Sequence, residues 1–130
     1  MNDAELVEAA RQAALGSYSP YSGFRVGAAL LDSDGNLYTG ANVENASYPV
    51  GSCAEATVVN HAVSTGARSF TVLAVSCLDA DDVEGSYPCG RCRQIMSEFG
   101  VERILVTSDA GEVRQHTLEE LMPHGFRNPA

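Results

Sequence analysis

Three of the four cysteines in this chain stand in two short motifs that place a strong demand on the fold. Cys53 opens the stretch CAE at residues 53–55, and Cys89 and Cys92 stand in PCGRC at residues 88–92. Residues three apart on a helix share one face, so Cys89 and Cys92 can meet a single ion. The same C-x-x-C spacing is also compatible with a redox pair or with two packed cysteines. A fold that brings Cys53 to this pair would supply three thiolates to one metal.

Length, composition and charge narrow the class of protein. The 130 residues are 45% hydrophobic and 19% charged, as in an ordinary globular protein, and we expect one domain spanning residues 1–130. Eight basic against seventeen acidic residues give a net charge of −9. This balance argues against nucleic acid as a partner, because phosphate binding needs a basic face, and against a polybasic membrane anchor.

The N-terminal stretch MNDAELVEAARQAALGS lacks the basic start and continuous apolar core of a signal peptide. No apolar run approaches the ~20 residues that a membrane span requires. We therefore expect a cytoplasmic protein. In a reducing compartment, four cysteines favour metal binding or catalysis over a disulfide framework.

The apolar pattern predicts alternating helices and strands. A helix is expected to end at Leu15, with Asn2 or Asp3 as its cap, and SDGN is typical of a hairpin turn. Alternating helices and strands imply parallel crossovers, so we predict an α/β fold of three layers, α/β/α, with a mixed five-stranded sheet opened by an antiparallel hairpin. The expected strands are 24–31, 37–44, 69–78, 102–108 and a short edge strand at 113–116, and the later helices are 53–65, 90–100 and a final turn at 117–121.

The predicted helix starts explain how the cysteines can meet. Cys53 and Cys89 both stand where a loop enters a helix. In an open sheet with parallel crossovers, helix N-termini face the carboxyl ends of the strands, where ligands bind. The helix macrodipole there stabilises thiolates, the form that binds zinc. Three protein ligands and one open position make the zinc arrangement of a catalytic site, not a structural one.

Glu55 has two interpretations. Ser52-x-x-Glu55 matches a capping box, in which the glutamate reaches back to the backbone of the cap residue. Beside Cys53, the carboxylate could instead accept a proton from water at the metal and deliver it elsewhere. Cys77 lies in an apolar strand and is interpreted as a buried small side chain, and the histidines 61, 116 and 124 as structural or solvent-facing.

The combination of C-A-E at 53–55 and P-C-x-x-C at 88–92 resembles the cytidine deaminase family, and the resemblance covers nearly the whole chain. PYSGFRVGAAL at 20–30 resembles the family's first strand, and NVENASY at 42–48 its nucleoside-binding stretch. The resemblance implies the cytidine deaminase-like fold and the following roles: zinc ligands Cys53, Cys89 and Cys92; proton shuttle Glu55; pyrimidine contact Phe24; ribose contacts Asn42 and Glu44; base contact the backbone of Ala54; and neighbouring-subunit contacts Tyr48 and Phe126.

The resemblance further implies a homotetramer that deaminates cytidine and deoxycytidine hydrolytically, with Zn²⁺ as cofactor and a place in pyrimidine salvage. Asn42 and Glu44 are two apart on an extended segment, so their side chains project to one side. An exposed polar strand end is the alternative for this pair, and a core position is the alternative for Phe24. Phe126, beyond the last expected element, is more easily explained as covering something than as exposed.

Position 56 departs from the family, because alanine stands where many members carry arginine near the thiolates. This feature, with CGRCRQ at 89–94, resembles blasticidin S deaminase, a relative that acts on a cytosine-containing antibiotic. Either Arg91 or Arg93 could turn toward the thiolates, or both could point to solvent or to a subunit interface. Three alternative functions remain: deamination of another aminated heterocycle such as blasticidin S, editing of a polynucleotide, and a zinc-stabilised binding module without catalysis.

Overall fold

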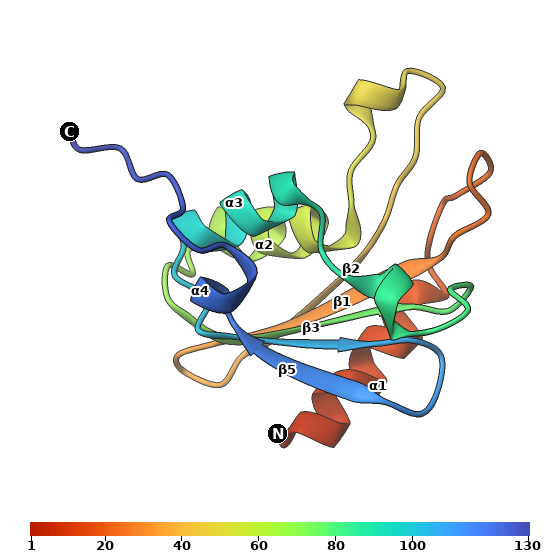
Figure 1. Ribbon diagram of the computed structural model, residues 1–130, viewed down its shortest axis with the longest axis horizontal. Coiled ribbons are helices and arrows are strands. Elements are labelled where there is room, and N and C mark those ends of the chain that lie inside the picture. The colour runs from red at the N-terminus through yellow and green to blue at the C-terminus, as the bar shows by residue number, and fades with distance from the viewer.

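The computed structural model describes residues 1–130, and a five-stranded sheet in the order β2-β1-β3-β4-β5 runs through its middle (Figure 1). Only β3 and β4 are parallel, and every other neighbouring pair is antiparallel. The predicted mixed sheet and its opening hairpin are confirmed. The strands are β1 Val26–Asp32, β2 Leu37–Ala41, β3 Phe70–Cys77, β4 Arg103–Thr107 and β5 Val113–Thr117.

Helices cover both faces of this sheet, which confirms the predicted three-layer α/β/α class. Helix α1, Asp3–Ala14, lies on one face, and α2, Ala54–Ser64, lies with α3, Gly90–Glu98, on the other, where the short α4, Leu118–Leu121, packs against α3 (Figure 1). Helix α2 connects β2 to β3, and α3 connects β3 to β4. Both helices therefore begin just beyond the carboxyl ends of strands. None of the helices is both long and apolar enough to cross a membrane.

Two apolar cores, one on each face, hold the layers together. The larger core includes Val58 of α2 and Met96 of α3, and the smaller one lies under α1. Strand β3 serves both, because its side chains alternate: Leu73 belongs to the larger core and Val72 to the smaller one. A strand buried on both faces needs a continuous apolar run, and this explains why FTVLAVSC at 70–77 shows no polar alternation.

Two glycines let the helices approach the sheet closely. A methyl group at Gly27 of β1 would overlap the backbone of α1 at Ala10 and Ala14. At Gly40 of β2 an added Cβ would lie 3.0 Å from the backbone nitrogen of Val58, so glycine there lets α2 settle on the hairpin. The start of α2, where Cys53 stands, depends on this second contact.

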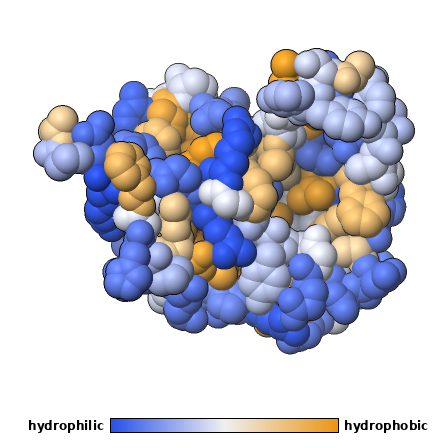
Figure 2. Space-filling model, turned by 45° about the horizontal axis from the view of Figure 1, so that its top comes forward, coloured by the Kyte–Doolittle hydropathy of each residue, from blue (hydrophilic) through white to orange (hydrophobic).

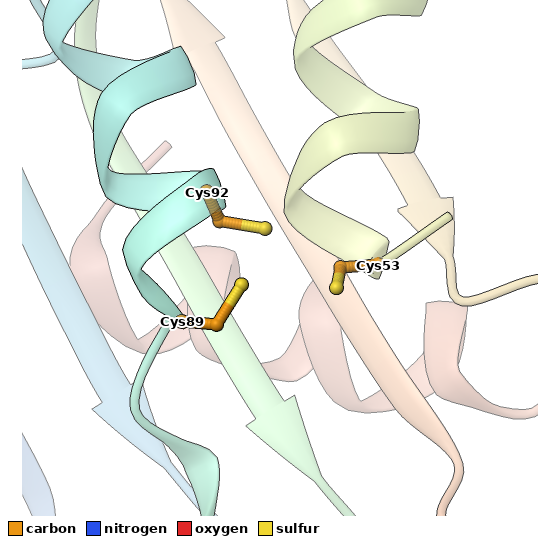
Figure 3. Close-up of side chains that lie close together, drawn as sticks. All are labelled: Cys53, Cys89 and Cys92. Atoms are coloured by element: carbon orange, nitrogen blue, oxygen red, sulfur yellow. The ribbon is translucent and has the colours of Figure 1, made fainter. Parts of the chain in front are cut away.

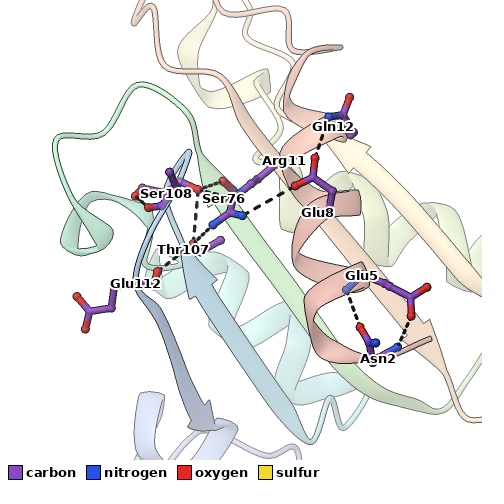
Figure 4. Close-up of polar contacts among 10 residues, drawn as sticks. Asn2, Glu5, Glu8, Arg11, Gln12, Ser76, Thr107, Ser108 and Glu112 are labelled. Atoms are coloured by element: carbon purple, nitrogen blue, oxygen red, sulfur yellow. Dashed lines mark hydrogen bonds and ion pairs between the residues drawn. The ribbon is translucent and has the colours of Figure 1, made fainter.

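Polar contacts tie α1 to the carboxyl ends of the parallel strands (Figure 4). The Arg11 guanidinium donates to the Thr107 hydroxyl at 2.9 Å and to the Ser108 carbonyl at 3.1 Å. The buried Ser76 hydroxyl donates to the same carbonyl at 2.7 Å. At the other end of α1, Asn2 is the cap, in a capping box with Glu5, which decides between the two predicted caps.

The predicted boundaries differ from the structure mainly around the site. The strand expected at 37–44 ends at Ala41, and Val43 forms only isolated bridges, to Tyr18 and Ser52. The strand expected from residue 24 starts at Val26. Two short 3₁₀ turns, Tyr48–Val50 and Val83–Ser86, had no clear sequence signal. Each precedes one of the helices that carry the clustered cysteines.

We predict that Gly27→Ala destabilises the protein by about 3 kcal/mol, since the overlap is with the backbone of α1 rather than with a movable side chain. Urea denaturation of the two proteins would measure the difference. Gly16→Ala is the matched control, because its added Cβ would make only an ordinary 3.4 Å contact with the Ala13 carbonyl. Equal stability of Gly27→Ala and the wild type would contradict the close packing of α1 on β1.

Candidate metal centre and adjoining pocket

Three cysteine sulfurs lie together where α2 and α3 begin (Figure 3). Cys53 is the N-cap residue of α2, Cys89 is the N-cap residue of α3, and Cys92 lies in the first turn of α3. Their Sγ atoms all lie within 4.8 Å of one another, and none is in a disulfide. The structure thus brings the sequence-separated Cys53 to the C-x-x-C pair, as the sequence predicts, while Cys77 is buried elsewhere in β3.

The donor set fits zinc. Tetrahedral zinc with Zn–S bonds of about 2.3 Å holds its sulfurs roughly 3.8 Å apart, which is compatible with three sulfurs that lie within 4.8 Å of one another. Neither Cys53 nor Cys89 caps its helix through its side chain. The first backbone N–H groups of both helices therefore remain available to stabilise negative charge on sulfur. Three soft ligands leave a fourth position for a small molecule.

The pKa values of the cysteine thiols also favour the binding of a cation. Hydrogen bonds from Cys92 and, more weakly, from Cys89 lower the pKa of Cys53 to about 6 against the effect of burial, and the charge of Arg91 contributes. The pKa of Cys92 is raised because its thiol donates to Cys53 and because it is buried. The metal-free cluster therefore keeps protons among its sulfurs, and a bound divalent cation would displace them.

Glu55 is buried beside the cluster in the first turn of α2, with only 4% of its surface exposed. Burial, and then the negative charge of Cys53, raises the pKa of Glu55 to about 7, although its own backbone N–H opposes the shift. The capping-box interpretation is wrong, because the N-cap residue is Cys53 and not Ser52. The Ser52 hydroxyl instead lies 3.0 Å from the Thr57 hydroxyl. The Glu55 carboxylate thus has no hydrogen-bond partner in another residue.

A pocket of about 410 Å³ opens from Cys53 between the loop before β1 and the segment after β2. In Figure 2, apolar side chains gather in the hollow beside the lobe that projects from the molecule. The pocket brings three predicted substrate residues, Asn42, Glu44 and Tyr48, to the same cavity as Cys53. Sequence reasoning did not single out the other lining residues, although most of them lie in motifs that it quoted: Tyr21, Ser22, Val43, Asn45, Gly51 and Ser52.

Asn42 is 8% exposed, and its amide is already engaged within the chain. Its Oδ1 accepts from the Val26 backbone N–H at 2.9 Å and from the Ser17 hydroxyl at 2.5 Å. Its Nδ2 donates to the Phe24 carbonyl at 2.8 Å. One amide hydrogen remains for a ligand. Asn42 therefore holds the loop before β1 in place, a role that the sequence did not indicate.

Glu44 is anchored through one carboxylate oxygen only. Its Oε1 accepts from the backbone N–H groups of Tyr21 at 2.9 Å and Ser22 at 3.1 Å. Hydrogen bonds from Ser22, first from its side chain, and from Tyr21 hold the pKa of Glu44 below its usual value. Neither of these backbone hydrogen bonds uses the second oxygen, Oε2, and Glu44 lines the pocket.

The three predicted aromatic contacts lie in different places. Tyr48 lines the pocket but is 74% exposed, with its ring 5.8 Å from that of Tyr21. Phe24 is 48% exposed and does not line the pocket, so it is not the core residue of the alternative interpretation. Phe126 is 68% exposed on the C-terminal tail, which leaves the body of the molecule beyond α4 (Figure 1).

Ala54 is buried as the first residue of α2, so its backbone N–H is one of the amides without an intrahelical partner.

The two arginines near the cysteines have different surroundings. Arg93 does not face the thiolates, because its guanidinium donates to the carbonyls of Pro88 at 2.8 Å and Leu121 at 2.6 Å. Arg91 is exposed and acts on Cys53 only through its charge. Neither arginine side chain therefore contacts the sulfurs directly, and the positive ends of the two helix dipoles lie at the cluster instead.

Comparison with known proteins supports the same chemistry. A sequence profile of the cytidine and deoxycytidylate deaminase zinc-binding region matches residues 1–108. A cytidine deaminase of Sporosarcina psychrophila is 42% identical over 129 residues, which cover 97% of this chain and 92% of that protein. The crystal structure of cytidine deaminase from Burkholderia pseudomallei matches with a TM-score of 0.90 at 40% identity, covering 97% of this chain and 100% of that one. A blasticidin-S deaminase of Bacillus cereus is less similar, 32% identical over 126 residues that cover 93% of this chain and 89% of that protein.

The matched region contains all three clustered cysteines and Glu55. Sequence, fold and donor set therefore agree, and the chain belongs to the family of cytidine and deoxycytidylate deaminases that share this zinc-binding region.

Proposed function

We propose that residues 1–130 form one catalytic domain that deaminates cytidine and deoxycytidine. Water adds at C4 of the pyrimidine, the C4–N bond breaks, and uridine or deoxyuridine leaves with ammonia. The observation that carries this proposal is the meeting of three cysteine sulfurs, with the buried carboxylate of Glu55 two residues after Cys53 and with Cys53 lining a pocket of about 410 Å³. Similar proteins named cytidine deaminases span almost the whole chain.

Cys53, Cys89 and Cys92 would hold zinc, which would make a water molecule acidic enough to act as the nucleophile near neutral pH. Glu55 accepts a proton from the attacking water on its carboxylate. It passes this proton to N3 of the ring, then takes the proton of the hydroxyl formed at C4 and passes it to the departing amine. A buried carboxyl with a pKa of about 7 can hold and release a proton near neutral pH, as such a shuttle must.

The rest of the pocket is assigned to the nucleoside. The free Oε2 of Glu44 and the remaining amide hydrogen of Asn42 bind ribose hydroxyls, and the N-terminal amides of α2, including that of Ala54, bind the base. Tyr48 closes the outer end of the pocket. Phe24 lies at the loop that Asn42 holds, and a change in that loop on binding would bring its ring to the pyrimidine.

Exposed apolar side chains also support the assembly of this chain into an oligomer. The segment after β2 exposes Tyr48 and Val50, and the tail exposes Phe126, although apolar side chains of this size are usually covered. We propose a homotetramer in which neighbouring copies cover these groups and Phe126 completes a neighbour's pocket. Light scattering of the full chain should give four copies, and a fully active monomer would contradict the assembly.

Four free thiols suit the cytoplasm, where the reaction would serve pyrimidine salvage.

The first experiment measures ammonia release from a panel of free cytidine, deoxycytidine, cytosine, blasticidin S and a cytosine-containing oligonucleotide. We expect turnover of the two nucleosides to exceed that of the other compounds. The similar blasticidin-S deaminase makes blasticidin S the sharpest competitor. A zinc-loaded protein that releases no ammonia from any of them would instead be a zinc-stabilised binding module.

Glu55→Gln should reduce the turnover of cytidine by roughly 10²–10⁴, because an amide cannot carry the proton. The variant should keep its fold and its zinc, since Glu55 makes no structural pair. Steady-state kinetics with metal analysis measures both properties. Glu98→Gln, an exposed glutamate of α3, is the matched control and should behave as the wild type. Near-normal turnover by a folded, zinc-loaded Glu55→Gln protein would refute the shuttle.

Glu44→Gln should raise the Michaelis constant for cytidine by about ten- to a hundredfold, the range expected for losing a hydrogen bond to a charged group. Reaction with free cytosine, which has no sugar, should change much less. The glutamine carbonyl can still accept from Tyr21 and Ser22, so the loop should stay in place. Equal losses on cytidine and cytosine would assign Glu44 to the fold or to the base pocket.

A further inference from the structure

The loop that leads into Cys89 is held through three consecutive residues, two of them by the strands β3 and β5 and one by Arg93 of α3. The Ser86 hydroxyl accepts from the backbone N–H of Cys77 in β3 at 3.2 Å. The Tyr87 hydroxyl lies 2.7 Å from Nε2 of His116 in β5. The Pro88 carbonyl accepts from Arg93 at 2.8 Å. The position of Cys89 therefore depends on contacts outside its own helix.

Arg93 makes the contact that joins the most parts of the site. It follows Cys92 directly, and its backbone N–H donates to the Cys89 carbonyl at 3.0 Å. Its Nε donates to the carbonyl of Pro88, in the peptide that carries the Cys89 nitrogen, while Nη1 donates to the Leu121 carbonyl at the end of α4 at 2.6 Å. The guanidinium thus bridges the cysteine loop and α4. The rigid guanidinium fork holds the two carbonyls in a fixed geometry, which the single, freely rotating ammonium group of lysine would not reproduce.

A second contact reaches the loop from the same C-terminal segment. His116 is the second-last residue of β5, just before α4, and its ring centroid lies 5.3 Å from that of Tyr87. Its Nδ1 lies 3.6 Å from a carboxylate oxygen of Glu120. Glu120 also completes the capping box of α4 with Thr117. Residues 113–121 therefore support the loop at both Tyr87 and Pro88.

We propose that Arg93 is a positioning residue for zinc, through which the β5–α4 segment holds Cys89 and Cys92 at their binding distance. The inference rests on the proposed assignment of these cysteines as ligands. A metal site gains affinity when its ligands are fixed before binding, and losing a residue that orients ligands costs about 10–100-fold in metal affinity. Arg93 contributes geometry here rather than charge, since its guanidinium points to carbonyls and not to sulfur.

The test is the rate at which zinc passes from the holoenzyme to a chromogenic chelator. Arg93→Gln should release zinc about ten- to a hundredfold faster than the wild type. Arg93→Lys keeps the charge but not the fork, so it should also release zinc several-fold faster. Arg68→Gln is the matched control, because Arg68 also donates to two carbonyls, of Val63 and Ala67, at the far end of α2. It should release zinc at the wild-type rate.

A second readout separates positioning from general stability. In cobalt-substituted protein, the visible absorption of the metal reports its ligand geometry, and it should change in Arg93→Gln but not in Arg68→Gln. Tyr87→Phe provides a milder variant if Arg93→Gln does not fold, because it removes only the hydroxyl that meets His116. It should speed zinc release by a smaller factor.

The possible outcomes distinguish an error in the zinc-ligand assignment from an error in the role given to Arg93. Wild-type protein that binds no zinc would overturn the ligand assignment itself. Wild-type zinc release by Arg93→Lys would mean that charge, not the fork, matters, and would overturn the proposal. Unchanged release by a folded Arg93→Gln would overturn it as well. If Arg93→Gln does not fold, wild-type release by Tyr87→Phe and Arg93→Lys together would do so.

Discussion

The meeting of three cysteine sulfurs at two helix N-termini is the constraint on which the rest of the site depends. It requires α2 and α3 to begin at the same edge of the sheet, and the strand order β2-β1-β3-β4-β5 produces this, because both helices follow strands that end there. Negative charge on the sulfurs is then opposed by backbone N–H groups from two helices. Close packing at Gly40 fixes the first of these helices against the sheet.

Two side chains that line the pocket, Asn42 and Glu44, also hold the surrounding backbone in place. Asn42 uses most of its hydrogen-bonding groups to hold the backbone at Phe24 and Val26, and Glu44 uses one carboxylate oxygen to hold the backbone at Tyr21. Under the proposed function, each keeps a group for the nucleoside: an amide hydrogen in Asn42 and an oxygen in Glu44. A side chain held by several contacts loses little freedom when a ligand binds, so this dual use pre-organises the site. Its consequence is that substitutions at Asn42 should damage the loop as well as binding.

The sequence predicted the elements and the cysteine cluster well, because both have strong local signals. The continuous apolar run of β3 reports burial on two faces, and loop-to-helix boundaries mark Cys53 and Cys89. The prediction was less successful where contacts between distant segments determine the local structure. The capping box at Ser52 was a local pattern that the actual start of α2 at Cys53 overrode. The structural bonds of Asn42 and the reach of Arg93 to α4 join residues far apart in the chain, and no spacing rule reveals them.

X-ray absorption at the zinc edge of the purified protein tests the central claim most directly. One zinc per chain, bound by three sulfurs at about 2.3 Å and one lighter atom, oxygen or nitrogen, is the result expected of a three-cysteine site with an open position. Four sulfur ligands would make the site structural. Folded protein without zinc, with Cys89 and Cys92 joined in a disulfide, would make the pair a redox centre. Either result would contradict the proposed metal centre and the reaction that depends on it.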